Sequence, residues 1–448
     1  MTNSPDQKSK VFIKTYGCQM NENDSEYMLG QLIDLGYQRT KDIFQSKLIL
    51  INTCCVREKV EQKIYSFLGK IKEIKEKNPE VLLGICGCMA QKEKDHIFQK
   101  IPYVNFIFGP SEIVNIKNII SELKINKKIL FFSEKSKEFY LNEIPIAREN
   151  RITALIQIMR GCNNFCSYCV VPYTRGREQS RNRIDIITEI KNLAKINYKE
   201  IILLGQNVNS YGKDSPDSSE DFPKLLSQIN KIEKINRIRF ITSHPKDFNY
   251  NLIQAIKDND KICEHIHLPI QSGSDKILKI MNREYDVAKY KAIIKEIRNN
   301  IDNVSITTDI MVGFPGETEE DFQNTLKTFE EIKFDSAFTF IYSNRESTVA
   351  SLIPDQVPLA IKKNRLWKLI SLQKKISTEI NKKLEGKTLE ILVEKKSIKK
   401  DLYQHQLSGR TRTNKTVVFI GNEELLGKLV QVKIIGTDAW TLYGELVK

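Results

Sequence analysis

The 448 residues, 40% of them hydrophobic, form a chain long enough to bury the cores of roughly two to four domains. No apolar run approaches the ~18 residues of a membrane span, and the polar start MTNSPDQKSK lacks the apolar core of a secretion signal. These features lead us to expect a protein that stays in the cytoplasm. The net charge of +14 favours polyanionic partners, although a lysine-rich composition without such a partner would give the same charge.

The N-terminal part alternates short apolar runs with amphipathic stretches. Helices are expected near Asp24–Leu35 and Glu58–Lys77, between the apolar runs KVFIKTYGC, KLILINTC and VLLGICGC. This βαβαβ pattern predicts an α/β domain built on a parallel sheet with helices on its faces.

Three of the nine cysteines, Cys18, Cys54 and Cys88, follow the ends of the first three predicted strands. Ligands bind at the carboxyl ends of strands in open α/β sheets, so the three thiols are expected on one rim. They could then hold an iron–sulfur cluster that keeps one iron open. Free cysteine is also a small apolar core residue, and we expect Cys55 and Cys86 to be packed in the core, with Cys55 pointing away from its neighbour.

A linker is expected at 127–151, and six further apolar strands follow it with helical patterns between them. The strands are ITALIQI, IILLG, RIRFIT, HIHLPI, VSITTDI and DSAFTFI. This repeat predicts a curved, partial (β/α)6 barrel, with chemistry at the carboxyl ends of its strands by analogy with complete barrels.

The stretch MRGCNNFCSYC follows the first of these strands and places Cys162, Cys166 and Cys169 close together. Thiolate sulfur selects zinc, copper(I) or iron–sulfur clusters, and these spacings let the three bind one centre. A structural zinc site needs a fourth protein ligand, but Cys263, expected in the core, lies far away along the chain. A cluster with one open iron is favoured, while zinc and a disulfide stay as alternatives. This CxxxCxxC spacing resembles that of the radical SAM superfamily.

Polar loops follow the next strands of the predicted barrel. In GQNVNSYG, Gln206 and Asn207 could hydrogen-bond the amino or carboxylate groups of a cofactor. SHP and QSGS follow the third and fourth strands, and in DIMVGFPGET Gly313 and Gly316 permit close backbone approach to a ligand. Because these loops share one end of the barrel, they predict a cofactor pocket.

The C-terminal segment alternates apolar and polar residues between glycines and predicts a small all-β barrel. Two groups of basic residues could contact phosphate, with ion pairing within the chain or contact with the cofactor as the alternative for the second group. The groups are Arg410, Arg412 and Lys415, and Arg175, Arg177, Arg181 and Arg183.

Together these motifs resemble the radical SAM methylthiotransferase family, and TYGCQMNENDSE, NTCCVREKVEQK, GCMAQ and HLPIQSGSDKILKIMNR resemble its tRNA 2-methylthioadenosine synthase branch. The resemblance implies three domains: a methylthiotransferase domain at 10–126 with the auxiliary cluster, a radical SAM core at 148–380 and a TRAM domain at 383–448. One departure is the cysteine at position 55, where the family usually has a residue that is not a ligand.

The resemblance also implies the chemistry and the partners. Cys162, Cys166 and Cys169 would hold one [4Fe-4S] cluster and Cys18, Cys54 and Cys88 a second, while Gln206, Asn207 and Gly313 would bind S-adenosylmethionine. The implied enzyme adds a methylthio group to C2 of N6-isopentenyladenosine, next to the anticodon on its 3′ side, in tRNA. It would be a cytoplasmic monomer that receives electrons from a flavodoxin or ferredoxin.

Three other functions remain open. Two are enzymes of the same chemistry that act on threonylcarbamoyladenosine in tRNA or on a ribosomal protein, and TYGCQMN and REKVEQK favour the isopentenyladenosine branch over both. The third is a non-catalytic iron–sulfur regulator that binds RNA, which would not need the ordered loops of a cofactor pocket.

Overall fold

The computed structural model describes residues 9–55, 58–123, 125–126, 128–132, 144–215, 221–397 and 406–447. Of the linker expected at 127–151, residues 127 and 133–143 lie outside the described residues. The chain forms two compact units. The first comprises Met1–Glu149, Leu155–Asn163 and Cys169–Asp185, and the second Asn150–Ala154, Asn164–Tyr168 and Ile186–Lys448. No helix among the described residues is long and apolar enough to cross a membrane.

The first unit is built on a six-stranded sheet in the order β2-β1-β3-β4-β5-β6, and every neighbouring pair is parallel. All residues of β3 are buried, as expected for a parallel strand covered on both faces. The strands are β1 (Lys10–Thr15), β2 (Gln38–Arg39), β3 (Leu48–Thr53), β4 (Leu82–Gly87), β5 (Phe106–Phe108) and β6 (Ile129–Phe131).

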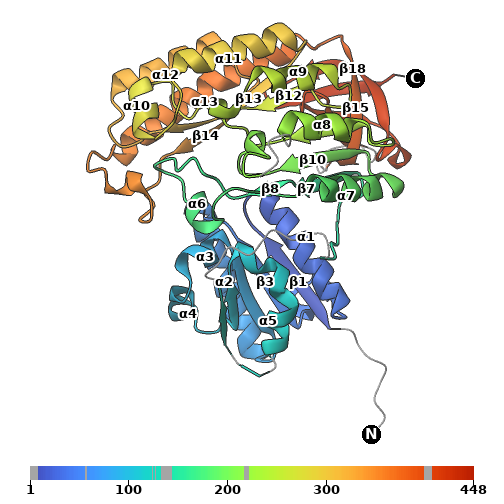
Figure 1. The fold of residues 1–448 in the computed structure, drawn as a ribbon, viewed down its shortest axis with the longest axis vertical. Coiled ribbons are helices and arrows are strands. Elements are labelled where there is room, and N and C mark those ends of the chain that lie inside the picture. The colour runs from blue at the N-terminus through green and yellow to red at the C-terminus, as the bar shows by residue number, and fades with distance from the viewer. Residues whose placement is uncertain are drawn as a thin grey trace. The chain divides into compact units, whose positions relative to one another are not determined.

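Helices cover both faces of this sheet (Figure 1). On one face, α1 (Gln19–Asp34) and α5 (Ile116–Glu122) pack in one apolar cluster. On the other face, a second cluster includes α2 (Glu58–Lys77), α3 (Cys88–Glu93) and α4 (His96–Lys100). The alternation of apolar strands and amphipathic helices therefore predicted this architecture correctly. Two short strands and one helix from the Leu155–Asn163 and Cys169–Asp185 segments complete the unit: β8 (Met159–Arg160), β9 (Gln179–Ser180) and α6 (Val171–Thr174).

The six strands predicted for the barrel are present, in sheets ordered β11-β10-β7 and β12-β13-β14. A parallel bridge connects Ile238 of β11 to Ile262, just before β12, so the strands follow one another in chain order, as in a partial barrel. They are β7 (Thr153–Gln157), β10 (Glu200–Leu204), β11 (Arg237–Phe240), β12 (His265–His267), β13 (Ser305–Val312) and β14 (Ser336–Ile341).

Helices connect these strands, and several begin at a side chain that accepts a hydrogen bond from the first turn, which stabilises a helix start. The caps are Asp221, Asn249, Ser274, Asp286 and Thr318. The helices are α7 (Arg183–Lys195), α8 (Phe222–Asn230), α9 (Tyr250–Asp258), α10 (Asp275–Ile280), α11 (Val287–Asn300), α12 (Glu319–Ile332) and α13 (Leu359–Lys382).

The C-terminal strands close into a small barrel in the order β15-β16-β17-β19-β18 around an apolar core, as predicted (Figure 1). The strands are β15 (Thr388–Lys396), β16 (Gln406–Thr411), β17 (Thr416–Ile420), β18 (Leu429–Thr437) and β19 (Thr441–Leu446).

Two arginines of β11 hold this barrel to the partial barrel within the second unit. Arg237 Nη1 donates to the Arg410 carbonyl at 2.7 Å, and Arg239 donates to the carbonyls of Thr411 at 2.7 Å and Arg412 at 2.8 Å. Arg239 also pairs at 2.8 Å with Glu200, and both side chains are buried. The β11 arginines thus give the barrel a fixed attachment.

Two basic side chains in a loop of the C-terminal barrel form ion pairs within the unit. Arg412 pairs with Glu264 at 2.6 Å, and Lys415 pairs with Asp335 at 2.7 Å. The contact of this loop with phosphate stays a prediction, and the sequence does not show that carboxylates of the partial barrel face the loop.

Candidate iron–sulfur sites and cofactor site

The first unit brings three strand-end cysteines to one rim of its sheet. Cys18 caps α1 shortly after β1, Cys54 follows β3 directly, and Cys88 begins α3 directly after β4. Strands β1, β3 and β4 are neighbours in the sheet. The backbone of Gly17, next to Cys18, lies so close to Cys54 that a Cβ at position 17 would be 2.9 Å from the Cys54 sulfur. The rim therefore collects the thiols that the sequence assigned to the auxiliary cluster.

A buried cation lies beside these thiols. Arg175 Nη2 donates to Asn21 Oδ1 and to Asp24 Oδ2, each at 2.7 Å, and the side chains of the Arg175–Asp24 pair are only 6% exposed. A hydrogen bond from Cys55 lowers the pKa of the Cys88 thiol to about 6; burial opposes this effect and the charge of Arg175 adds to it. A thiol with a lowered pKa forms the thiolate that binds iron.

The donor set suits an iron–sulfur cluster by its chemistry. Thiolate sulfur is a soft ligand that binds such clusters, and the buried cation Arg175 would offset the negative charge of the thiolates.

Cys55 does not point away from the neighbouring thiols, as the sequence had led us to expect. Its side chain hydrogen-bonds Cys88, and both residues are buried in the same apolar cluster. Cys86 is a core residue as expected, with its sulfur 3.7 Å from that of Met28, and Cys263 is buried too. The orientation of Cys55 depends on how α3 packs, which the sequence does not reveal.

Cys55 is expected to be a neighbour of the auxiliary cluster and not a ligand. Cys55→Ala should then leave about eight irons per reconstituted chain, and adding Cys54→Ala should remove about four. Iron analysis after reconstitution measures both values. If Cys55→Ala alone removes about four irons, Cys55 is a ligand.

The second cysteine set lies in the loop after β7. Cys162 and Cys169 belong to the first unit and Cys166 to the second, so their grouping follows from their spacing in the sequence. Within the second unit, Arg283 Nη1 lies 3.3 Å from the Cys166 sulfur.

Polar side chains from the loops after β10 and β11 contact one another. Asn207 Nδ2 donates to Asp247 at 2.7 Å, and Asn209 Nδ2 donates to the His244 carbonyl at 3.0 Å. The His244 ring lies edge-on to Tyr285, with 5.7 Å between the ring centroids. These contacts gather two of the strand-end loops that the sequence assigned to the cofactor pocket.

Several polar atoms of these loops are buried without a partner in the described structure: Asn207 Oδ1, Ser243 Oγ and His244 Nε2. His244 Nδ1 accepts the Lys246 N–H at 3.2 Å, so Nε2 carries the proton of the neutral ring. Burial and the charges of Arg283, Lys246 and Lys213 lower the pKa of His244 to about 2. Buried polar groups normally have partners, so this set fits a polar ligand such as S-adenosylmethionine.

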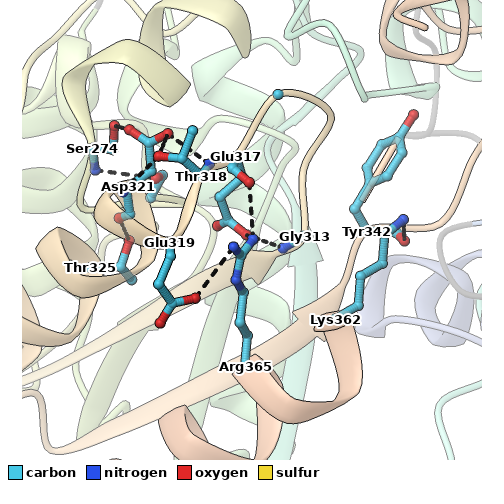
Figure 2. A network of polar contacts seen from close by, with 12 residues as sticks. Ser274, Gly313, Glu317, Thr318, Glu319, Asp321, Thr325, Tyr342, Lys362 and Arg365 are labelled. Atoms are coloured by element: carbon cyan, nitrogen blue, oxygen red, sulfur yellow. Dashed lines mark hydrogen bonds and ion pairs between the residues drawn. The ribbon is translucent and has the colours of Figure 1, made fainter. Parts of the chain in front are cut away.

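Gly313 begins a network after β13 that Figure 2 shows from close by. Its N–H donates at 2.6 Å to Glu317, which also accepts from Arg365 at 2.7 Å. Gly313 has φ +70, and a Cβ there would lie 2.3 Å from Lys362 Cγ. The absence of a side chain at Gly313 therefore lets Lys362 of α13 pack against the backbone. The role of Gly313 in cofactor binding remains a prediction.

The same network fixes the start of α12 through Asp321. This carboxylate accepts from Ser274 at 2.6 Å and forms a capping box with Thr318. Although partial burial opposes the shift, the hydrogen bonds from Ser274, Thr318 and Lys276 lower the pKa of Asp321 to about 2.

Asp321→Asn is expected to lower the free energy of unfolding at pH 7 by about 1 kcal/mol, because solvent partly screens the lost interaction. The pKa of Asp321 is about 2 in the folded chain and near 4 in the unfolded chain. Its carboxylate therefore stabilises the fold above about pH 4, and this stabilisation is lost as the pH falls through about 2. Urea unfolding of the two proteins should therefore give curves that converge as pH falls below about 5. A constant difference down to pH 3 would contradict this assignment.

Two of the arginines after the cysteine loop are engaged within the first unit. Arg175 pairs with Asp24, and Arg181 is buried and donates to the Gln157 carbonyl at 3.4 Å. Ion pairing within the chain, the alternative weighed from the sequence, describes Arg175 correctly.

Comparison with known proteins identifies the family of this chain. Three family models match: "Uncharacterized protein family UPF0004" at residues 10–109, the radical SAM superfamily at 156–329 and the TRAM domain at 382–447. A tRNA-2-methylthio-N(6)-dimethylallyladenosine synthase of Thermoanaerobacter pseudethanolicus is 50% identical over 97% of this chain and 92% of its own length. The chain belongs to this synthase family. A Clostridium tetani member is 48% identical over 98% of this chain and 97% of its own length.

Solved structures of lower identity agree on the fold. The radical S-adenosylmethionine methyltransferase TsrM from Kitasatospora setae has a TM-score of 0.56 at 14% identity, covering 77% of each chain. The family resemblance and the α/β fold class inferred from the motifs are thus confirmed for this member of the synthase family.

Sequence reasoning missed four residues that shape these sites: Asp24, His244, Arg283 and Glu317. Each lies inside or beside a motif that it had already singled out, such as SHP, MNR and GFPGET. Each of the four residues contacts a buried group that is distant in the sequence, and a local sequence pattern does not reveal such a contact.

Proposed function

We propose that the protein is a radical SAM methylthiotransferase that adds a methylthio group to C2 of N6-isopentenyladenosine, next to the anticodon on its 3′ side, in tRNA. The observation that carries this proposal is the identity of about half of all residues with synthases named for this product, over nearly the whole of both chains.

Six cysteines would hold the two [4Fe-4S] clusters in this proposal. Cys162, Cys166 and Cys169 would bind the cluster that works with S-adenosylmethionine, and Cys18, Cys54 and Cys88 the auxiliary cluster. When bound, these cofactors supply the one-electron chemistry that an inert aromatic carbon–hydrogen bond requires. The placement of Cys18, Cys54 and Cys88 on one rim beside Arg175 supports the assignment of the auxiliary cluster.

The strand-end loops would bind S-adenosylmethionine, through Gln206, Asn207 and Gly313. Asn207 Oδ1 is a buried acceptor with no described partner, so it can receive a hydrogen bond from an ammonium or hydroxyl group. His244, held neutral by burial and nearby charges that lower its pKa to about 2, offers a donor at Nε2. These two groups would orient the cofactor without adding charge.

The tRNA would be held by the C-terminal barrel and by the basic surface that the net charge of +14 provides. Because the Arg412 and Lys415 side chains form ion pairs, the more exposed Arg410 and surface lysines would make the phosphate contacts. A flavodoxin or ferredoxin would supply electrons to a monomeric cytoplasmic enzyme. The domain boundaries at 10–126, 148–380 and 383–448 are part of the same proposal.

The test is a strain that lacks the gene for this protein. Mass spectrometry of its digested tRNA should show isopentenyladenosine without the methylthio group, and a plasmid copy should restore the modified nucleoside. If that nucleoside persists while methylthio-threonylcarbamoyladenosine or the ribosomal-protein modification disappears, the substrate assignment is wrong. If none of these modifications changes, an iron–sulfur RNA-binding regulator becomes the better description.

A further inference from the structure

Arg283 is a buried arginine that contacts an expected cluster ligand. It follows α10 in the chain, is 8% exposed, and its Nη1 lies 3.3 Å from the Cys166 sulfur. Its Nε donates to the Tyr285 hydroxyl at 2.8 Å and its Nη2 to the Pro269 carbonyl at 3.1 Å. The guanidinium is therefore held in one orientation, with its remaining edge towards the sulfur.

Apart from the Cys166 sulfur, the hydrogen-bond acceptors described for Arg283 are uncharged. Tyr285 and Pro269 offer a hydroxyl and a carbonyl oxygen, and the hydroxyl is fixed in turn by the Ile270 carbonyl at 2.9 Å. A buried arginine is costly unless an anion lies nearby. Arg175, for example, is buried beside the carboxylate of Asp24, at 2.7 Å. Among the acceptors described for Arg283, the Cys166 sulfur is the one that can carry a negative charge.

We propose that Arg283 is a positioning residue that supplies the fixed positive charge for the cluster held by Cys162, Cys166 and Cys169, and thereby sets its reduction potential. This inference rests on the proposed cluster ligands. A charge-assisted hydrogen bond to the Cys166 thiolate draws negative charge away from the irons and is kept strong by its low exposure to water. The cluster then accepts an electron at a higher potential than it would without the arginine.

The test compares Arg283→Met, which removes the charge, with Arg283→Lys, which keeps the charge but loses the planar fork. Both changes are made in the full chain with Cys18, Cys54 and Cys88 replaced by alanine, so that one cluster gives the signal. A potentiometric titration followed by EPR spectroscopy reports the potential. Arg283→Met should shift it to a more negative value, and Arg283→Lys should lie closer to the parent.

Matched controls separate charge from shape. Tyr285→Phe keeps the arginine and removes one of its acceptors, so its shift should be smaller than that of Arg283→Met. In the chain that lacks Cys162, Cys166 and Cys169, Arg283→Met should leave the potential of the auxiliary cluster unchanged.

The outcomes distinguish this inference from the cluster assignment. Iron analysis of the wild-type chain tests the ligands alone, and a failure to bind about eight irons rejects them whatever Arg283 does. With the clusters present, equal potentials for Arg283→Met and its parent would overturn the inference. Loss of the cluster from both the Met and Lys variants would also overturn it, since shape and not charge would then be required. Loss from the Met variant alone supports it.

Discussion

Replacing Cys162, Cys166 and Cys169 together by alanine is expected to abolish methylthio transfer and to lower the iron content from about eight to about four per reconstituted chain. The reason is that three thiolates hold each cluster in the proposed arrangement, and the auxiliary set has three thiolates of its own on the rim of the N-terminal sheet. Iron and sulfide analysis gives the stoichiometry, and EPR spectroscopy of the reduced protein identifies the cluster that remains.

The matched control replaces Cys18, Cys54 and Cys88. It should also leave about four irons, but this variant should still cleave S-adenosylmethionine, whereas the first should not. Cys86→Ala changes a cysteine that packs against Met28 and should keep about eight. Tightly bound zinc in the wild-type protein, or unchanged iron in either triple variant, would contradict the two-cluster assignment.

Arg239→Ala is expected to cause the largest loss of stability, about 3 to 5 kcal/mol, because it leaves Glu200 as an unpaired buried charge. The same change removes the donors of the barrel carbonyls at Thr411 and Arg412. The midpoint of urea unfolding should fall accordingly, and limited proteolysis should cut the C-terminal barrel sooner.

The control for this change is Arg410→Ala on the neighbouring strand β16. Arg410 is 45% exposed and reaches Glu394 at 3.5 Å, so its removal should cost less than about 1 kcal/mol. Equal effects of the two substitutions would show that the buried attachment is unimportant. Deleting the barrel after Leu384 would also leave Arg237 and Arg239 without their partners in the barrel. Weaker tRNA binding by such a deletion could therefore result from lost stability of the remaining chain.

The architecture was largely predictable because its signals are local. Buried parallel strands appear as apolar runs, and the helix expected at Glu58–Lys77 has those bounds in the structure. The other helix expected in the N-terminal part begins earlier, at Gln19, because Cys18 is its capping residue and no polar cap marks the start. The rim of strand-end cysteines followed from the rule that ligands bind at the carboxyl ends of parallel strands.

The details of the sites were less predictable because they depend on partners distant in the sequence. Cys55 lies beside Cys88 through the packing of α3, and Arg412 meets Glu264 only after the barrel docks. The Arg283 contact with Cys166 likewise joins residues from two loops. A basic or thiol side chain in a motif indicates which chemistry is available, and tertiary packing decides which group it contacts.

Complementation of the deletion strain with the triple-cysteine variants tests the central claim most directly. Mass spectrometry of tRNA nucleosides should find the methylthio-isopentenyl nucleoside restored by the wild-type gene and by Cys86→Ala. The variants that lack Cys18, Cys54 and Cys88, or Cys162, Cys166 and Cys169, should leave isopentenyladenosine without the methylthio group. Restoration by either triple variant, at wild-type protein levels, would contradict an enzyme that needs both clusters.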